Sequence, residues 1–237
     1  MKNILYWIIQ DHASLPDDLH WLSTQEQERL NTFRFQKRRQ DWLLGRWTVK
    51  KLVSLALSIE NLELDEIIIQ NESSGAPFVL LRNVRLEGSV SISHRGDFAV
   101  AAYCHEPALS VGIDLELIEE KTQGFLEDYF TSSEVNQIMK LAQDERFLAA
   151  SLFWSGREAI LKAHQIGLRV DTRSFELRYS AFLDDQNWHP LEMIAYPREL
   201  GQIKLFWKQI EAYIITLAVK QKNQEIIFSP DLIDQIS

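Results

Sequence analysis

Residues 89–117 alternate apolar and polar side chains in three short runs, the pattern that is typical of half-buried β-strands. Two runs, in SVSISHRGDFAVAAYC (89–104), flank the tripeptide RGD and predict a β-hairpin with Gly96 in its turn. The third run, VGIDLEL (111–117), places Gly112, Asp114 and Glu116 on one strand face. The middle of the chain must therefore fold into a sheet that carries two carboxylates on one side of a strand.

Patterns of helical spacing lie on both sides of this sheet region. Apolar residues recur with helical period between Leu19 and Leu57 and predict two or more helices there. Thr131 and Glu134 form a capping-box pattern that opens a helix, and a second helix is expected from about Glu145 to His164. Strand-like runs at 4–9 and between 173 and 228 complete the pattern of an α+β fold.

The composition excludes several classes of protein. The chain has 237 residues, of which 46% are hydrophobic, enough for a packed core rather than a disordered chain. Its formal charge of -9 argues against a general nucleic-acid binder, whose affinity comes from phosphate neutralisation. The single cysteine, Cys104, forms no internal disulfide, and no apolar run reaches the roughly 18 residues that span a bilayer. We expect a soluble, unprocessed, cytoplasmic protein with no membrane partner.

The charge is unevenly distributed along the chain. Residues 29–51 hold eight basic residues and one acid, a net charge of +7, so the rest of the chain carries -16. One interpretation of the basic segment is a solvated helix face. The other is a surface that binds phosphate groups on an otherwise acidic protein.

Two groups of acidic residues are candidates for catalysis. Asp114 and Glu116 stand two residues apart on a strand and can present their oxygens together to a hard cation such as Mg²⁺, although solvent-facing acids give the same pattern. In FWSGREAILKA (153–163), Glu158 and Lys162 are neighbours on one helix face, either as a surface ion pair or as a catalytic pair. Gly156 indicates a close approach of another group to this helix, or it is simply a glycine that the helix tolerates.

Small and polar residues near the hairpin are candidates for ligand binding. His94 lies at the end of a predicted strand beside Ser93 and the glycine turn, where it can donate to a phosphate, although a lone histidine is also a common structural residue. Gly112 on the carboxylate face is expected to leave room for a ligand.

Taken in order, five segments resemble the 4'-phosphopantetheinyl transferases of the larger, Sfp-like class. They are the basic stretch that ends in LLGRW (43–47), SSGAP (73–77), SISHRGDFAVAA (91–102), VGIDLE (111–116) and FWSGREAILKA (153–163). Each motif alone is a modest signal, and together they are specific. The resemblance covers roughly residues 1–220.

This resemblance implies a monomer of two similar α+β halves related by a pseudo-twofold axis. The N-terminal half, residues 1–108, would bind coenzyme A, and the C-terminal half, residues 109–237, would hold the metal, the catalytic helix and the carrier protein. The enzyme would transfer the 4'-phosphopantetheine group of coenzyme A to a serine of an apo acyl or peptidyl carrier protein and release 3',5'-ADP.

The resemblance also assigns roles to individual residues. The Mg²⁺ ligands fall on Asp114, Glu116 and Glu158, and Glu158 would also act as base toward the carrier serine, directly or through a water. Lys162 would contact the phosphate and stabilise the leaving group. The residues expected to contact coenzyme A are Arg29, Lys37, Arg46, Gly75, Pro77, Ser93, His94, Asp114 and Lys162, with Arg38 and Arg39 as further candidates.

The chain departs from the family pattern at two positions. Ala76 stands where a lysine commonly lies between the glycine and the proline, and Arg157 replaces the usual lysine before the metal-binding glutamate. Arginine keeps the charge of that lysine but differs from it in geometry. Neither change removes a predicted metal ligand, so we expect an active enzyme.

The segment KTQGFLEDYF (121–130) is the expected docking site of the carrier. Its apolar residues, Phe125, Leu126, Tyr129 and Phe130, would contact the carrier, or else they belong to the core. Two alternative functions stay open. One is a catalytically idle protein that binds carriers or coenzyme A, and the other is a different Mg²⁺-dependent transferase that uses a nucleotide.

Overall fold

A computed structural model of the chain describes residues 4–166, 170–180, 187–221 and 233–235. The chain divides into two compact units. The first unit comprises Met1–Leu109 together with Asp231–Ser237, and the second comprises Ser110–Pro230. Within the described ranges, no helix combines the length and the apolar character that a membrane crossing requires.

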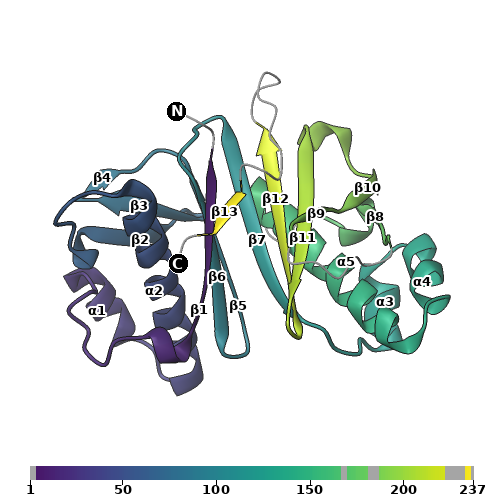
Figure 1. The fold of residues 1–237 in the computed structure, drawn as a ribbon, viewed down its shortest axis with the longest axis horizontal. Coiled ribbons are helices and arrows are strands. Elements are labelled where there is room, and N and C mark those ends of the chain that lie inside the picture. The colour runs from purple at the N-terminus through teal and green to yellow at the C-terminus, as the bar shows by residue number, and fades with distance from the viewer. Residues whose placement is uncertain (1–3, 167–169, 181–186, 222–232, 236–237) are drawn as a thin grey trace. The chain divides into compact units, whose positions relative to one another are not determined.

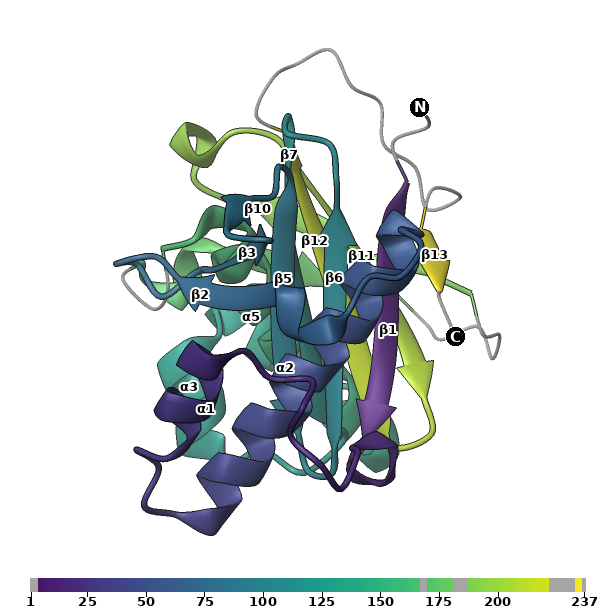
Figure 2. The same ribbon diagram turned by 90° about the vertical axis from the view of Figure 1, so that its left-hand side faces the viewer.

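The first unit contains a four-stranded sheet and a three-stranded sheet, and its long helix packs against both of them (Figures 1 and 2). The larger sheet has the strand order β13-β1-β6-β5 and the smaller one β2-β3-β4. The elements are β1 (Leu5–Asp11), α1 (Thr24–Leu30), α2 (Gln36–Leu57), β2 (Ile67–Asn71), β3 (Pro77–Leu81), β4 (Val84–Arg85), β5 (Ser89–Arg95), β6 (Phe98–Cys104) and β13 (Ile233–Gln235), with short 3-10 helices at His12–Ser14 and Leu64–Glu66.

The hairpin predicted from residues 89–104 is confirmed. Strands β5 and β6 pair antiparallel, with Arg95 opposite Phe98, so that Gly96 and Asp97 form a two-residue loop. Gly96 adopts a φ of 60°, in the left-handed region that tight hairpin turns require and that glycine enters without steric cost.

The second unit is built around α5 and two sheets. The larger sheet has the order β7-β12-β11-β9, and the smaller one pairs β10 with β8. The elements are β7 (Leu109–Leu117), α3 (Gln123–Tyr129), α4 (Ser132–Met139), α5 (Gln143–His164), β8 (Glu176–Arg178), β9 (His189–Pro190), β10 (Glu192–Ala195), β11 (Ile203–Ile210) and β12 (Tyr213–Gln221), with 3-10 helices at Thr172–Ser174 and Arg198–Leu200. The capping box that Thr131 and Glu134 predict at the start of α4 is present.

The two units share one topology. In each larger sheet the first strand of the unit pairs with the second strand of a hairpin, and the first strand of that hairpin lies on the far side, as β1-β6-β5 and as β7-β12-β11. In each unit a long helix and a smaller sheet separate the first strand from the final hairpin along the chain. The prediction of two similar α+β halves is therefore confirmed at the level of topology.

The C-terminal residues depart from the predicted boundaries of 1–108 and 109–237. Strand β13 pairs in parallel with β1, with Ile233 opposite Leu5, and so it belongs to the first unit. The sequence between 228 and 237 carries no strand pattern that would have predicted this pairing.

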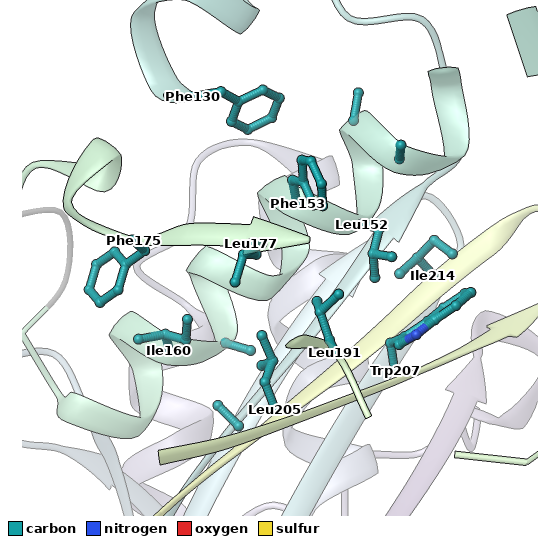
Figure 3. Close-up of a cluster of buried hydrophobic side chains, with 14 of the residues drawn as sticks. Phe130, Leu152, Phe153, Ile160, Phe175, Leu177, Leu191, Leu205, Trp207 and Ile214 are labelled. Atoms are coloured by element: carbon teal, nitrogen blue, oxygen red, sulfur yellow. The ribbon is translucent and has the colours of Figure 1, made fainter. Parts of the chain in front are cut away.

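The core of the second unit surrounds α5 (Figure 3). Phe153 and Ile160 of α5 are fully buried, and Leu177 from β8 and Leu205 from β11 pack in the same cluster. Gly156 lies on this side of the helix, because a Cβ there would stand 3.0 Å from Leu177 and 3.3 Å from Leu205. The close approach that Gly156 predicts is made by core leucines.

Candidate functional site

The carboxylate face of β7 packs directly against α5. Ser110 Oγ donates to the carbonyl of Ala163 at 2.7 Å, and a Cβ on Gly112 would lie 2.0 Å from the carbonyl oxygen of Ala159. Gly112 therefore leaves no room for a ligand, and that prediction was wrong. Its role is to let the backbone of α5 touch the strand. This contact brings Glu158 and Lys162, on the same turns of the helix, beside Asp114.

Lys162 of α5 reaches the strand at Asp114. Its Nζ donates to Asp114 Oδ1 at 2.7 Å and to the carbonyl of Ile113 at 3.1 Å. The Asp114 side chain is only 5% exposed and that of Lys162 is 27% exposed. A buried carboxylate is stabilised by such a charge-assisted contact. The structure thus joins two groups that the sequence places 48 residues apart.

Glu158 lies one turn before Lys162 and is half-buried. Burial raises the pKa of the Glu158 carboxyl, the negative charge of Asp114 raises this pKa further, and Lys162 lowers it. A raised pKa means that the carboxyl binds a proton more tightly than an ordinary glutamate does. Glu158, Asp114 and Lys162 therefore form one electrostatically coupled group.

Glu116 is the second carboxylate on this strand face and has a basic neighbour, Lys121, that no pattern in the sequence indicates. Lys121 Nζ lies 3.8 Å from Glu116 Oε2 and 3.0 Å from Glu119 Oε1. Lys121 follows β7 by four residues, too close in sequence for a pattern to distinguish a site residue from an ordinary connecting lysine.

The fit of a divalent cation depends on the three carboxylates. In the part of the chain that the structure describes, no group of three or more His, Cys, Asp or Glu side chains is gathered closely enough to hold a metal as it stands. The donor chemistry nevertheless suits Mg²⁺, which prefers carboxylate oxygens. The repulsion between Asp114 and Glu158 is a charge imbalance that a bound cation would relieve.

In the first unit, Arg46 is tied to the turn formed by SSGAP. Arg46 Nη2 donates to Asn71 Oδ1 at 3.4 Å, and Asn71 Nδ2 donates to the carbonyl of Gly75 at 2.7 Å. Gly75 has a φ of 92° in this turn, and Pro77 begins β3 immediately after it. The structure therefore brings three predicted contacts for coenzyme A, namely Arg46, Gly75 and Pro77, to one place.

Arg46 is a partly buried cation with an acidic and a basic neighbour, and its Nε lies 3.9 Å from Glu26 Oε1. Its side chain is 13% exposed, and its guanidinium stands 4.9 Å from the centre of the Trp42 ring. Burial lowers the pKa of Arg46, Glu26 raises it and the nearby charge of Arg29 lowers it. A partly desolvated arginine with a second arginine close by attracts a phosphate more strongly than an isolated surface cation does.

The other basic residues of α2 have different surroundings. Lys37 is 82% exposed and pairs with Asp41 at 3.1 Å, an i,i+4 contact of the kind that contributes little. Lys50 is fully buried and bonded to Glu26, so it is unavailable to a ligand. Arg39 donates to the carbonyl of Leu30. The basic residues of α2 thus range from the fully buried Lys50 to the exposed Lys37.

Ser93 and His94 lie near the end of β5, but adjacent strand residues face opposite ways. His94 shares a face with Ile92, whose Cδ1 would be 2.9 Å from a Cβ on Gly45 of α2. His94 is exposed on this face, and Ser93 lies on the other one. Of the two, His94 is on the side of Arg46.

The aromatic residues after β7 form a cluster of their own. Phe125 and Tyr129 are half-buried and pack edge-on against Trp154, with ring centres 5.1 and 5.0 Å away. Leu126 and Phe130 are buried in the core of the unit. Only two of the four expected carrier contacts therefore keep exposed surface. Trp154 lies one turn before Glu158 on α5.

Two family profiles match adjacent parts of this chain. Residues 110–218 match the family described as the 4'-phosphopantetheinyl transferase superfamily. Residues 11–106 match the family described as 4'-phosphopantetheinyl transferase, N-terminal. The two matches together cover both structural units and meet at the division between them.

Individual relatives agree with the profiles. The chain is 28% identical over 192 residues to the L-aminoadipate-semialdehyde dehydrogenase-phosphopantetheinyl transferase of Rattus norvegicus, covering 73% of this chain and 60% of that protein. It is 30% identical over 178 residues to a phosphopantetheinyl transferase of Thraustochytrium, covering 70% and 58% respectively. It is 26% identical over 160 residues to the 4'-phosphopantetheinyl transferase psf-1 of Bacillus pumilus, covering 68% and 65%. The matches thus span about 60% of the length of these relatives.

Proposed function

The chain belongs to the 4'-phosphopantetheinyl transferase superfamily, and we propose that it transfers the 4'-phosphopantetheine group of coenzyme A to a serine of an apo acyl or peptidyl carrier protein. In this reaction the serine oxygen forms a bond to the β-phosphorus, the bond to the bridging oxygen breaks, and 3',5'-ADP leaves. The observation that carries the proposal is the coupled group of Asp114, Glu158 and Lys162 at the contact between β7 and α5.

Each residue of this group has a task that follows from its surroundings. Glu158 accepts the proton of the carrier serine, directly or through a water. Lys162 supplies a positive charge to the leaving phosphate and exchanges its bond to Asp114 for one to the substrate. Asp114, Glu116 and Glu158 would hold Mg²⁺, whose charge offsets that of the pyrophosphate.

For coenzyme A we propose contacts from the first unit at Arg46, Gly75, Pro77, His94 and Arg29. Arg46 is supported by its partial burial and by its connection to the SSGAP turn through Asn71. Ser93 stays a predicted contact on the opposite strand face. Lys37, which is exposed and paired with Asp41, is left out of this set.

The carrier is proposed to dock on the second unit beside α3 and α4. A cavity of about 510 Å³ opens there, lined by apolar side chains that include Val135, Ile138 and Met139, with Lys121 and Arg146 among its polar lining. Met139 is 51% exposed. An acidic carrier helix with apolar residues complements such a surface. Phe125 and Tyr129 extend the contact toward Glu158.

Three further properties are proposed. The protein acts as a monomer, because each unit buries its own core and the two matched profiles supply both halves of the family pattern in one chain. It works in the cytoplasm, since its cysteine, Cys104, is buried and free. No nucleic acid takes part, given the net charge of -9.

The test is a mass measurement on carriers. The protein is incubated with coenzyme A, Mg²⁺ and several apo carriers of acyl and peptidyl type, and each carrier is weighed by mass spectrometry. We expect at least one carrier to gain one phosphopantetheine group. If a carrier binds but none gains mass, the protein is an idle binder, and if coenzyme A is consumed without modification of a carrier, it is a different transferase.

A further inference from the structure

We propose that Arg157 is a positioning residue, which fixes the rotation of α5 and thereby sets where Glu158 and Lys162 stand relative to Asp114. The catalytic consequence of this inference rests on the proposed function. The structural part, that Arg157 holds α5 in one orientation, stands on contacts within the second unit alone.

Arg157 is fully buried, and its guanidinium makes four hydrogen bonds. Nε donates to the carbonyl of Thr172 at 3.0 Å, Nη1 to that of Phe153 at 3.0 Å, and Nη2 to that of Phe175 at 2.8 Å. Nη2 also pairs with the carboxylate of Glu134. One side chain thus ties α5 to α4 and to the segment that precedes β8.

Glu134 connects the same contact to two further elements. Its Oε2 accepts from the backbone N–H of Thr131 at 2.9 Å and closes the capping box of α4. Its Oε1 accepts from the backbone N–H of Leu177, in β8, at 2.8 Å. Both Glu134 and Arg157 are completely buried, so the pair excludes water and holds a defined geometry.

The position of Arg157 along the helix gives this contact its effect on the site. Successive residues of an α-helix point about 100° apart, so Arg157 faces the core while Glu158 faces β7. On the opposite side, Gly112 lets β7 touch the backbone of α5 at Ala159. The helix is therefore held from two sides, and loss of the Arg157 contacts would free it to turn and carry Glu158 and Lys162 away from Asp114.

The first unit contains the same arrangement of a capping glutamate and a buried cation on the long helix, but the cation is a lysine. Glu26 closes the capping box of α1, accepts from the backbone N–H of Ile69 at 3.2 Å and pairs with Lys50 of α2 at 2.6 Å. Lys50 is fully buried and also donates to the carbonyls of Trp21 and Leu64. A lysine is therefore sufficient to fix a long helix against its neighbours in this way. The residue after Lys50 is Lys51, not an acid, so this copy carries no proposed metal ligand.

This duplication supplies the controls for a test. Arg157→Gln removes the cation in the second unit, Lys50→Gln removes the equivalent one in the first unit, and Arg157→Lys restores a cation of the kind that the first unit uses. The thermal midpoint, Mn²⁺ affinity by electron paramagnetic resonance with coenzyme A present and no carrier, and the KM and kcat of transfer are measured for each variant.

We expect both glutamine variants to lower the thermal midpoint, because each leaves a buried glutamate without its cation. Below their melting temperatures, Arg157→Gln weakens Mn²⁺ binding and lowers kcat by about ten-fold or more, the usual effect of losing a residue that orients a metal ligand. Arg157→Lys stays within about two-fold of wild type in both quantities. Lys50→Gln does so when coenzyme A is saturating, because Arg46, a proposed contact for coenzyme A, lies on the helix that Lys50 holds. Glu134→Gln, which keeps the cap acceptor, replaces Arg157→Gln if that variant does not fold.

Amide hydrogen exchange provides a readout that needs neither metal nor turnover. The amides of α5 after Arg157 should exchange faster in Arg157→Gln and stay protected in Lys50→Gln. Wild-type protein that neither binds Mn²⁺ nor modifies a carrier would contradict the proposed function. The exchange measurement would still test whether Arg157 fixes the orientation of α5. An Arg157→Gln variant that melts lower but keeps wild-type exchange, Mn²⁺ affinity and kcat would overturn the inference and leave Arg157 a stabilising residue only.

Discussion

At the scale of single residues, Asp114 is where the strand and the helix of the site meet. It bonds to Lys162, and its charge opposes ionisation of Glu158. In the metal-free protein, the ionised form of Glu158 therefore lowers the stability of the folded state. This is common for residues placed for catalysis, which are often poorly matched to the folded state that holds them.

The first prediction concerns Glu158→Gln and pH. The folded state raises the pKa of Glu158 above its ordinary value of 4.5, so it binds this proton more tightly than the unfolded state does. The stability that this proton contributes is present below pH 4.5 and is lost as the pH rises through the folded pKa. In EDTA, Glu158→Gln should therefore unfold at higher urea concentration than wild type at pH 7 and at a similar one at pH 4.

The same variant separates stability from catalysis. Because glutamine neither accepts the serine proton nor offers a charged metal ligand, we expect Glu158→Gln to lower kcat by about a hundred-fold or more. Added Mg²⁺ should raise the urea midpoint of wild type and leave that of the variant nearly unchanged. Equal Mg²⁺ effects on the two proteins would contradict the assignment of Glu158 to the metal site.

The second prediction concerns Gly112. A Cβ at this position would stand 2.0 Å from the carbonyl of Ala159 and 2.5 Å from the nitrogen of Ala163, so Gly112→Ala must push α5 away from β7. We expect the free energy of unfolding to fall by about 3 kcal/mol, at the upper end for overpacking, and kcat to fall with it. Urea unfolding and the transfer assay measure the two effects.

Gly124→Ala in α3 is the matched control for this prediction. A Cβ on Gly124 meets nothing within 4 Å, and the helix gains stability of up to about 1 kcal/mol from the change. If Gly112→Ala behaved like Gly124→Ala, the contact between α5 and β7 would not be as close as described.

At the scale of elements, α2 shows how one helix divides its charges between structure and ligand. Lys50 is buried beneath the helix with Glu26, Lys37 is exposed beside Asp41, and Arg46 lies between these extremes at the SSGAP turn. A basic run in the sequence is therefore a mixture of residues, and only their burial and partners separate them.

A third prediction follows for this helix. Arg46→Ala should weaken binding of coenzyme A by about ten-fold or more, because a partly buried, charge-assisted contact to phosphate is lost. Lys37→Ala should change the dissociation constant by less than about two-fold. Titration calorimetry with coenzyme A checks both values, and a loss at Lys37 as large as that at Arg46 would reverse the proposed assignment.

The elements also show how far the sequence alone could predict the site. Alternation assigns Asp114 and Glu116 to one strand face, and helical spacing assigns Glu158 and Lys162 to one helix face, because these are local properties of the chain. Which helix packs on which strand is not local. Without the fold, one could not predict that Lys162 bonds to Asp114, or that the backbone of α5 occupies the space beside Gly112.

The capping residues are a different case. The pattern of Thr131 and Glu134 correctly predicts the start of α4. It does not predict that Glu134 also pairs with Arg157, 23 residues later, since a capping glutamate is usually satisfied by its own helix. Arg157 therefore looks like a substituted site residue in the sequence and is a core residue in the structure.

At the scale of the whole molecule, two units repeat one topology but carry different chemistry. Each holds its long helix with a buried cation and a capping glutamate, as Lys50 with Glu26 and as Arg157 with Glu134. The residue that follows is Lys51 in the first unit and Glu158 in the second. The same scaffold thus presents a cation in one copy and a carboxylate in the other.

The distribution of charge along the chain agrees with different proposed roles for the two units. A net charge of -9 contains a segment of +7 at residues 29–51, placed in the unit proposed to bind coenzyme A. The carboxylates of the second unit are proposed to hold a cation. An acidic protein can in this way bind a phosphate-rich substrate through local charge.

The central claim is that the group formed by Asp114, Glu158 and Lys162 transfers phosphopantetheine to a carrier serine. The most direct measurement is the mass of an apo carrier after incubation with coenzyme A, Mg²⁺ and either wild-type protein or Lys162→Met, with a carrier serine-to-alanine variant as control. We expect wild type to add one phosphopantetheine group to the serine carrier alone, and Lys162→Met to do so at least about a hundred-fold more slowly. Transfer by Lys162→Met at the wild-type rate, or no mass gain on any carrier with wild type, would contradict this claim.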